Sequence, residues 1–281
     1  KTTVRTDILA GITTFLAMAY ILAVNPNYLG GIPGASPAAI FMATAISAAI
    51  ATICMAFFAN YPVALASGMG LNAFFAFTVC GAMGCSYQVA LTAVFVEGII
   101  FMILSLFKFR EALVNKIPTN LKFGITAGIG LFIAFLGMQN AGLIQTNQYT
   151  LVQFVNIKDG DWATQVAPAL VAFIGFIIIA ILNKLKVKGN IIIGIAASTV
   201  LYYVFTAQVP SFDISGVGQA FKDFGAVGIT GLFDGEAWAK AFSGAHVGSL
   251  FNAIMLIITF CLVDMFDTVG TLYGASAQAG M

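Results

Sequence analysis

Charged residues are scarce in this sequence, and their scarcity defines the class of protein. Only 8% of the 281 residues are Asp, Glu, Lys or Arg, whereas 60% are hydrophobic. Soluble globular domains carry about 25% charged residues, so this composition excludes a soluble domain. A net charge of +1 gives no basis for binding nucleic acid. The composition therefore predicts an all-α polytopic membrane protein, with the lipid bilayer as its solvent.

Histidine and paired cysteines are also lacking. The single histidine is His246, which nearly excludes a metal site or a proton relay built from histidine. The four cysteines show no C-x-x-C spacing, so they predict neither a zinc site nor a disulfide framework. No metal ion or cofactor is expected on these grounds.

Apolar runs are abundant, and eight of them have approximately the length that a membrane segment needs. The predicted segments are Ile8–Val24, Ala38–Ala59, Val63–Cys80, Gln88–Phe107, Phe123–Met138, Ala167–Leu182, Ile191–Ala207 and Val247–Tyr273. A long connection of mixed charge, residues 208–246, precedes the last of them and is expected on the outer side.

The basic residues orient these segments. If the N-terminus is cytoplasmic, nine of the twelve Lys and Arg residues fall on the inner side and three fall outside, as the positive-inside rule requires. Most acids then fall outside. Three acids are left within membrane segments, namely Glu97, Asp264 and Asp267. The sequence therefore predicts a multi-pass protein of the cell membrane (plasma or inner membrane).

The eighth segment carries a polar stripe. Asp264, Asp267, Thr268 and Thr271 are spaced i, i+3, i+4, i+7, so a helix places them on one face. A charged residue at the bilayer centre costs about 2.5–3.5 kcal/mol on insertion scales, so such residues face a partner or a cavity. We predict that this stripe lines a substrate site. A purely structural alternative is a protonated pair that bonds to backbone carbonyls.

The third segment is interrupted. Pro62, Gly68 and Gly70 oppose a continuous helix, so we predict a short extended piece followed by a helix that starts near Gly70. Broken backbone at membrane depth occurs only where it is buried or lines a cavity. Asn72 offers both a donor and an acceptor, which suits the edge of a heterocycle. A close contact between helices explains the glycines equally well.

Two other features leave alternatives open. Glu97 lies in the middle of the fourth segment, and it is either a proton-relay group or a protonated acid satisfied by neighbouring backbone. Gly124-x-x-x-Gly128 in the fifth segment matches a small-residue pattern for helix packing, which is the preferred interpretation of these glycines.

Four stretches of the sequence resemble one transporter family, and they occur in the same order as in that family. They are Asp7–Tyr20, Gly68–Ala76, Gly128–Phe135 and Val263–Thr271. They are similar to the azaguanine-like branch, which comprises adenine/guanine/hypoxanthine permeases, of the nucleobase:cation symporters in the xanthine/uracil permease superfamily. The resemblance extends over nearly the whole chain.

The resemblance implies a fold of 14 segments in two inverted repeats of seven, in which the third and tenth segments are each part strand and part helix. The chain would then hold the first repeat in residues 1–246 and the start of the second in residues 247–281. It would be a fragment that lacks the glutamate of the tenth segment and should not transport by itself. Homodimers are also implied.

The resemblance also assigns the site. Asn72 matches the polar residue of the third segment, Met69 and Gly70 match backbone that faces the base, and Asp264 and Asp267 match the acids of the eighth helix. With Thr268 on the same stripe, these residues are the predicted substrate-binding set for a purine nucleobase.

Two acids one turn apart repel when both are ionised, which favours a shared proton and coupling to the proton gradient. Asp267, Asp264 and Glu97 are the candidate proton-coupling residues, with the roles of the two aspartates left open. The predicted function is proton-coupled import of adenine, guanine or hypoxanthine. The alternatives are an intramembrane Mg²⁺-dependent transferase that uses Asp264 and Asp267, and an anion transporter of similar fold.

Overall fold

A computed structural model describes most of the chain. The described residues are 4–61, 63–107, 115–158, 160–187, 189–207, 216–243 and 250–279. His246 and the predicted repeat boundary between residues 246 and 247 lie outside them.

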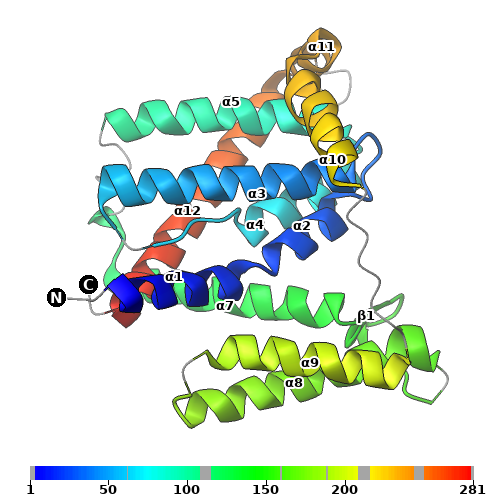
Figure 1. The fold of residues 1–281 in the computed structure, drawn as a ribbon. Helices are drawn as coiled ribbons and strands as arrows, with labels where there is room; N and C mark the ends of the chain where they lie inside the picture. Colours follow the sequence, from blue (N-terminus) through cyan, green and yellow to red (C-terminus); the bar gives the residue numbers. More distant parts are fainter. Residues whose placement is uncertain are drawn as a thin grey trace. The chain divides into compact units, whose positions relative to one another are not determined.

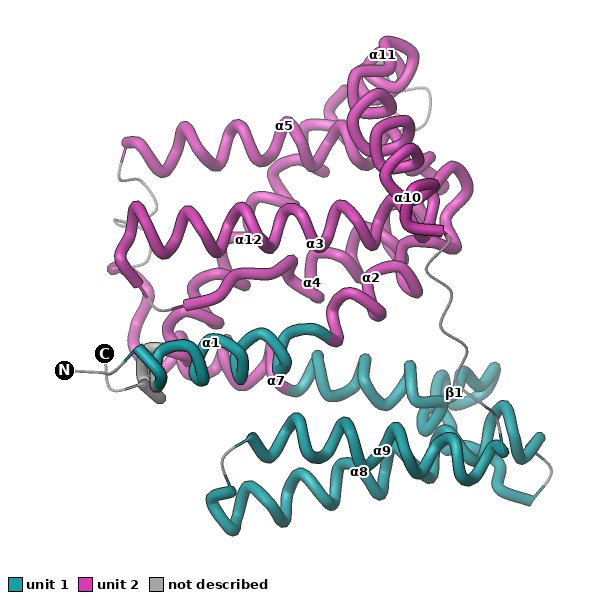
Figure 2. The backbone as a smooth tube through the Cα atoms, viewed as in Figure 1, with its two compact units in different colours: residues 1–19, 131–213 teal, residues 20–130, 214–281 magenta. Residues whose placement is uncertain are grey.

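The chain forms two compact units (Figure 2). One, unit 1, contains residues 1–19 and 131–213, and the other, unit 2, contains residues 20–130 and 214–281. Helix α7 (Thr119–Asn140) contributes its first part to unit 2 and its second part to unit 1.

Unit 1 is built around a helix pair. It comprises α1 (Val4–Met18), β1 (Ile144–Asn147), β2 (Leu151–Phe154), η3 (Trp162–Val166), α8 (Ala167–Lys184) and α9 (Asn190–Thr206). Helices α8 and α9 lie side by side (Figure 1), and they approach closely because Gly175 faces Ser198 and Gly194 faces Ile179. Asp161 accepts hydrogen bonds from Thr164 N and Oγ1 (2.9 and 2.5 Å) at the start of η3, and these bonds lower the pKa of its carboxyl.

A β-hairpin in unit 1 was not predicted. Strands β1 and β2 pair antiparallel, with Ile144 opposite Phe154 and Asn147 opposite Leu151. The prediction of an all-α protein is therefore wrong in this short stretch. The hairpin connects two helices instead of crossing a bilayer, so no long apolar run marks it, and the side chain of Asn147 accepts from the backbone N–H groups of Tyr149 and Thr150 in its turn.

Unit 2 contains the predicted site. Its helices are α2 (Ile21–Leu29), α3 (Pro37–Cys54), η1 (Met55–Ala59), α4 (Met69–Ala73), η2 (Phe74–Ala82), α5 (Tyr87–Leu106), α10 (Val217–Asp223), η4 (Phe224–Thr230), η5 (Gly231–Phe233), α11 (Gly235–Ser243) and α12 (Leu250–Ala279). The short α4 contacts α2 on one side and α12 on the other, and α12 also contacts α5 (Figure 1).

The core of unit 2 lies where η2, α5 and α12 meet. Phe260 on α12 is fully buried, and its ring packs edge-on against Phe74 at the start of η2. Val79 and Ala90 are also fully buried in this cluster. The core therefore fixes the acid-bearing helix against the helix that follows the interrupted segment.

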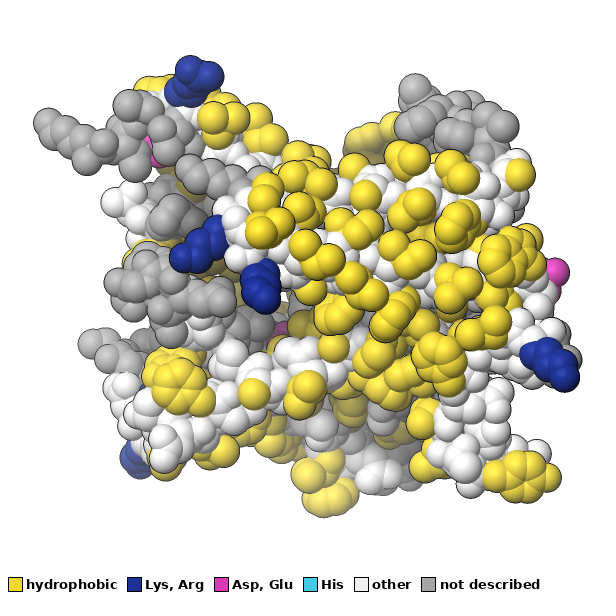
Figure 3. Space-filling view, turned by 90° about the horizontal axis from the view of Figure 1, so that it is seen from below, with side chains coloured by type: hydrophobic (Ala, Val, Ile, Leu, Met, Phe, Trp, Pro, Cys, Tyr) yellow, Lys and Arg dark blue, Asp and Glu magenta, His cyan; other side chains and the backbone are white. Residues whose placement is uncertain are grey.

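Apolar side chains are also abundant on the outside of the chain. Phe58 and Leu106 are 88% and 82% exposed. On the face drawn in Figure 3, hydrophobic side chains cover a broad area, with few charged ones among them. Such a surface is stable in lipid, where outward-facing apolar groups cost nothing to solvate.

Each predicted segment overlaps a described helical span, and their ends differ by up to six residues. Six described helical spans are long and apolar enough to cross a membrane, and they are Asp7–Leu29, Pro37–Ala59, Tyr87–Leu106, Thr119–Asn140, Trp162–Lys184 and Leu250–Ala275. Shorter apolar helices, Met69–Ala82 and Asn190–Thr206, occupy the third and seventh positions. The prediction of a polytopic helical membrane protein is thus supported.

The described part of the long connection before α12, residues 216–243, contains helices. Helices α10 and α11 form in it, and Ala220, Ala237 and Ala241 are buried. These helices left little sign in the sequence, because their buried positions are small alanines instead of large apolar residues, and many glycines lie among them.

Candidate functional site

The third segment is interrupted before its helix, as predicted, but residues 63–68 form no β-strand, unlike the part-strand segment that the resemblance implies. Residues 63–68 have no regular secondary structure, and Gly68 is extended (φ −71°, ψ 128°) immediately before α4 begins at Met69. Thr52 of α3 holds the extended piece, since its Oγ1 accepts from Leu65 N (3.0 Å) and donates to Leu65 O (3.3 Å). One side chain thus satisfies both backbone groups of a residue that no ladder pairs, as backbone at membrane depth requires.

Gly68 lies directly against Asp267. A Cβ atom placed on Gly68 would overlap Oδ2 of Asp267. The end of the extended piece therefore meets the acidic stripe of α12, and only a glycine permits the approach. The two stretches that the sequence singled out separately are neighbours in the structure.

Asn72 is held by a polar network that crosses three elements. Its Nδ2 donates to Oδ1 of Asn25 on α2 (2.7 Å) and, more weakly, to Oγ of Ser67 (3.4 Å). The Nδ2 of Asn25 donates in turn to Ser67 Oγ (2.6 Å) and to Thr44 Oγ1 on α3 (3.0 Å). Asn25 is only 2% exposed.

Sequence reasoning missed Asn25, Thr44 and Ser67. Asn25 follows directly after the predicted segment Ile8–Val24 and precedes Pro26, whereas both residues lie inside α2 in the structure. A polar residue followed by a proline at the end of a membrane segment was the available signal.

The stripe on α12 is helical, as predicted. Thr268 Oγ1 donates to Asp264 O (2.8 Å), and Thr271 Oγ1 donates to Asp267 O (2.7 Å). These bonds use the hydroxyl hydrogens, so each threonine can only accept a further hydrogen bond. Asp264, Asp267 and Thr268 are half-buried, whereas Thr271 is exposed.

Glu97 lies close to this stripe. It projects from α5, which packs against α12, and it is 3% exposed and within electrostatic reach of Asp264. Its Oε1 has no hydrogen-bond partner among the described residues. Bonding to neighbouring backbone therefore does not account for this oxygen, and an unpartnered buried carboxyl oxygen is the kind of feature that marks a functional group in a membrane helix.

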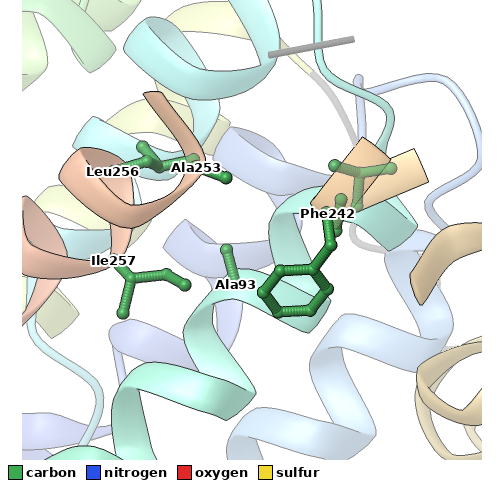
Figure 4. A pocket seen from close by; sticks show the side chains of 7 residues that line it. Ala93, Phe242, Ala253, Leu256 and Ile257 are labelled. Carbon is green, nitrogen blue, oxygen red and sulfur yellow. The ribbon is translucent and has the colours of Figure 1, made fainter. Parts of the chain in front are cut away.

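A small pocket of unit 2 lies apart from these polar groups. It is lined by apolar side chains of α5, α11 and α12, including Ala93, Phe242 and Ile257 (Figure 4). Ile257 precedes Asp264 by seven residues, or about 10 Å along a helix. The pocket contains none of the predicted site residues.

Helix packing next to Asp267 uses glycines other than the predicted pair. Gly270 faces Ile125 and Ile129 of α7, Gly274 faces Thr126, and Thr126 Oγ1 donates to Gly270 O (2.9 Å). Gly124 and Gly128 have no described atom within 4 Å of a Cβ built on them. The small-residue contact thus lies on α12, one turn beyond the acid.

A family profile described as the Permease family (Xan_ur_permease) matches residues 5–281. The chain belongs to this permease family. The family is described as one of permeases, which supports the prediction that the chain is not an enzyme and removes support for the transferase alternative.

Several curated relatives of the chain are named as permeases for guanine and hypoxanthine or for adenine. The chain is 42% identical over 291 residues to the guanine/hypoxanthine permease PbuG of Bacillus subtilis, and all of the chain is matched to 61% of that protein. It is 38% identical over 280 residues to the adenine permease AdeP of Escherichia coli, again over its whole length and 58% of the relative. The guanine/hypoxanthine permease PbuO of Bacillus subtilis is 37% identical over 285 residues, with coverage of 100% and 61%.

The chain therefore spans about 60% of the length of the curated relatives that it matches. The resemblance inferred from the four sequence stretches is confirmed by these matches.

Proposed function

We propose that the protein containing this chain imports purine nucleobases across the cell membrane by proton symport. The observation that carries the proposal is the apposition of Gly68 and Asp267, because it brings the broken segment and the acidic stripe to one place. The purine permeases similar to this chain support the substrate class.

The chemistry of the site suits a base. A carboxylate accepts N–H hydrogen bonds from a purine edge, and such charge-assisted bonds are strong. Asp267, Asp264, Asn72 and Thr268 would bind the base through side chains, and Met69 and Gly70 through first-turn backbone groups of α4. Asn72 N makes the bond to Gly68 O, so the backbone N–H groups of Met69 and Gly70 precede it in the helix. An anionic substrate is disfavoured because these side chains offer acceptors, not cations.

Proton coupling would use the acids on the facing helices. Glu97 and Asp264 act on each other electrostatically, and Asp267 follows Asp264 by one turn. Three carboxyl groups near one another within membrane segments would favour binding of a proton over three separate charges. Substrate and proton would then be carried together as one bundle rocks against another around the site, which requires the inverted repeats implied by the resemblance.

Uptake of radiolabelled hypoxanthine, guanine and adenine tests the proposal. Cells that lack their own purine permeases would express the complete open reading frame that encodes this chain. We expect uptake that collapses with a protonophore and persists when choline replaces Na⁺. Asp267→Asn and Asp264→Asn should abolish uptake, whereas Asn72→Ala should mainly change affinity or base preference.

Glu236→Gln is the matched control for the acidic variants. It removes an exposed ion pair to Lys240 on α11, and exposed pairs contribute little, so uptake should stay within about twofold of wild type. Normal uptake by both aspartate variants would refute the site, and uptake that depends on Na⁺ would refute proton coupling.

A further inference from the structure

In the network of Thr44, Asn25 and Asn72, the bonding of Thr44 determines which group donates and which accepts in each hydrogen bond. The hydroxyl hydrogen of Thr44 is donated to Ile40 O (2.8 Å) on its own helix. Thr44 Oγ1 can therefore only accept a bond from Asn25, at 3.0 Å. This contact determines which way round the Asn25 amide stands, with Nδ2 toward Thr44.

The orientation of the Asn25 amide determines the orientation of the Asn72 amide. With Nδ2 of Asn25 committed to Thr44 and Ser67, its Oδ1 faces Asn72, which must donate to it. Both recorded bonds of the Asn72 side chain among the described residues use its Nδ2. A flipped Asn72 would set two acceptor oxygens against each other at 2.7 Å. What Asn72 has left to offer a ligand is its Oδ1 acceptor.

We propose that Asn25 is a positioning residue for specificity. With Thr44 behind it, Asn25 holds Asn72 so that Asn72 presents only an acceptor, and the site therefore reads an N–H group of the bound base at this point. This inference rests on the proposed function, since the ligand it concerns is a purine base.

The neighbouring groups are consistent with this polarity. Thr268 can only accept, because its hydroxyl hydrogen is donated to Asp264 O. Asp267 lies against Gly68, and Gly68 precedes Asn72 by one helical turn. The site therefore presents acceptor side chains to the ligand. Purine bases differ in where they offer N–H donors: adenine offers a 6-amino group beside an accepting N1, whereas hypoxanthine offers N1–H beside an accepting O6.

The first experiment tests the network without a ligand. Thermal unfolding of the purified full-length protein in detergent would be measured for Asn25→Ala, Asn72→Ala and the double variant. Because the two side chains share a hydrogen bond, we expect the double variant to unfold at a higher temperature than the sum of the single effects predicts. Additive effects would overturn the inference.

The second experiment tests whether Asn72 accepts a hydrogen bond from an N–H group of the bound base. Binding of adenine and hypoxanthine would be compared with that of analogues lacking one N–H (N-methyl) or one ring acceptor (deaza), in wild type and in Asn72→Ala. In wild type, one N-methyl analogue should bind more weakly than its parent base, and in Asn72→Ala this affinity ratio should fall about three- to tenfold. The affinity ratios for the deaza analogues should be the same in both proteins. If Asn72→Ala instead changed the affinity ratio for an analogue that lacks an acceptor, the inference would be overturned.

If Asn25→Ala does not fold, a less disruptive substitution and its control can test the same inference. Thr44→Val keeps the shape but removes the acceptor that orients Asn25, so discrimination against the same N-methyl analogue should fall about three- to tenfold. Thr92→Val is the matched control, because Thr92 is also buried and donates to a carbonyl of its own helix, Gln88 O (2.9 Å), but lies outside the network. Equal discrimination in Thr44→Val and Thr92→Val would overturn the inference.

The outcomes also separate this inference from the proposed function. If the purified protein binds no purine base while the unfolding effects are non-additive, the proposed function fails, and with it the assignment of a base as the ligand. If purines bind but Asn72 couples to an acceptor, only the specificity inference fails.

Discussion

Gly68 is the residue at which the extended piece meets the acid of α12. Glycine is required there for space: its φ is an ordinary −71°, but a Cβ would overlap Asp267 Oδ2. The overlapping atom is the end of a side chain and not backbone, so Asp267 can rotate away. A substitution at Gly68 should therefore disturb the position of the carboxylate more than it disturbs the fold.

Gly68→Ala tests this role. We expect purine uptake to fall about tenfold or more at equal expression, because the added methyl group displaces the Asp267 carboxylate from its place beside the broken segment. The measurement is initial uptake rate, normalised to protein in the membrane. Gly128→Ala is the control, since its Cβ would meet nothing within 4 Å and alanine favours a helix. Equal uptake by the two variants would contradict the role assigned to Gly68.

At the scale of elements, α12 is positioned by two neighbours of different kinds. On one side, α5 and η2 form an apolar core around Phe260. On another, Gly270 and Gly274 let α7 approach, with Thr126 Oγ1 bonding to Gly270 O. Close packing of small residues and interhelical hydrogen bonds stabilise helix pairs in lipid, where there is no hydrophobic drive between helices. This crossing lies one turn from Asp267.

Gly270→Leu should weaken this crossing. A leucine there collides with Ile125 and Ile129, and overpacking of this kind costs about 1–3 kcal/mol. We expect a lower unfolding temperature in detergent, measured by the fluorescence of a thiol-reactive dye or by light scattering. Gly128→Leu on α7 makes the same chemical change at an open position and should leave the unfolding temperature nearly unchanged. A similar loss in both variants would show that the crossing is not specific.

At the scale of the whole molecule, orientation in the membrane follows from charge and not from the fold. Basic residues predict a cytoplasmic N-terminus, which places the loop around Lys184 inside and that around Lys158 outside. The two positions bracket the helix α8, so they must lie on opposite sides if α8 crosses the bilayer.

Cysteine labelling tests this orientation. In a variant without the native cysteines, Lys158→Cys should react with a membrane-impermeant maleimide in intact cells, whereas Lys184→Cys should react only after permeabilisation. The reverse pattern would invert the proposed topology, and labelling of both in intact cells would show that α8 does not cross the membrane.

The class of protein, the positions of the apolar segments, the break before α4 and the stripe of acids could all be predicted from the amino-acid sequence. These features are local: the length of an apolar run, the chemistry of glycine, and a spacing of three or four residues are present in the chain before it folds. Even the hairpin error has this origin, because β1 and β2 are too short to leave a clear period.

Only the tertiary structure decided which faces meet. The partnership of Asn25 with Asn72, the approach of Gly68 to Asp267, and the choice of Gly270 and Gly274 over Gly124 and Gly128 each join residues that are distant in the chain. Such contacts depend on the rotation of each helix about its axis, and in a mostly apolar sequence every face of a helix is suited to burial or to lipid. The physical reason is that hydrophobicity specifies depth in the membrane, whereas hydrogen bonds and steric fit select the neighbour.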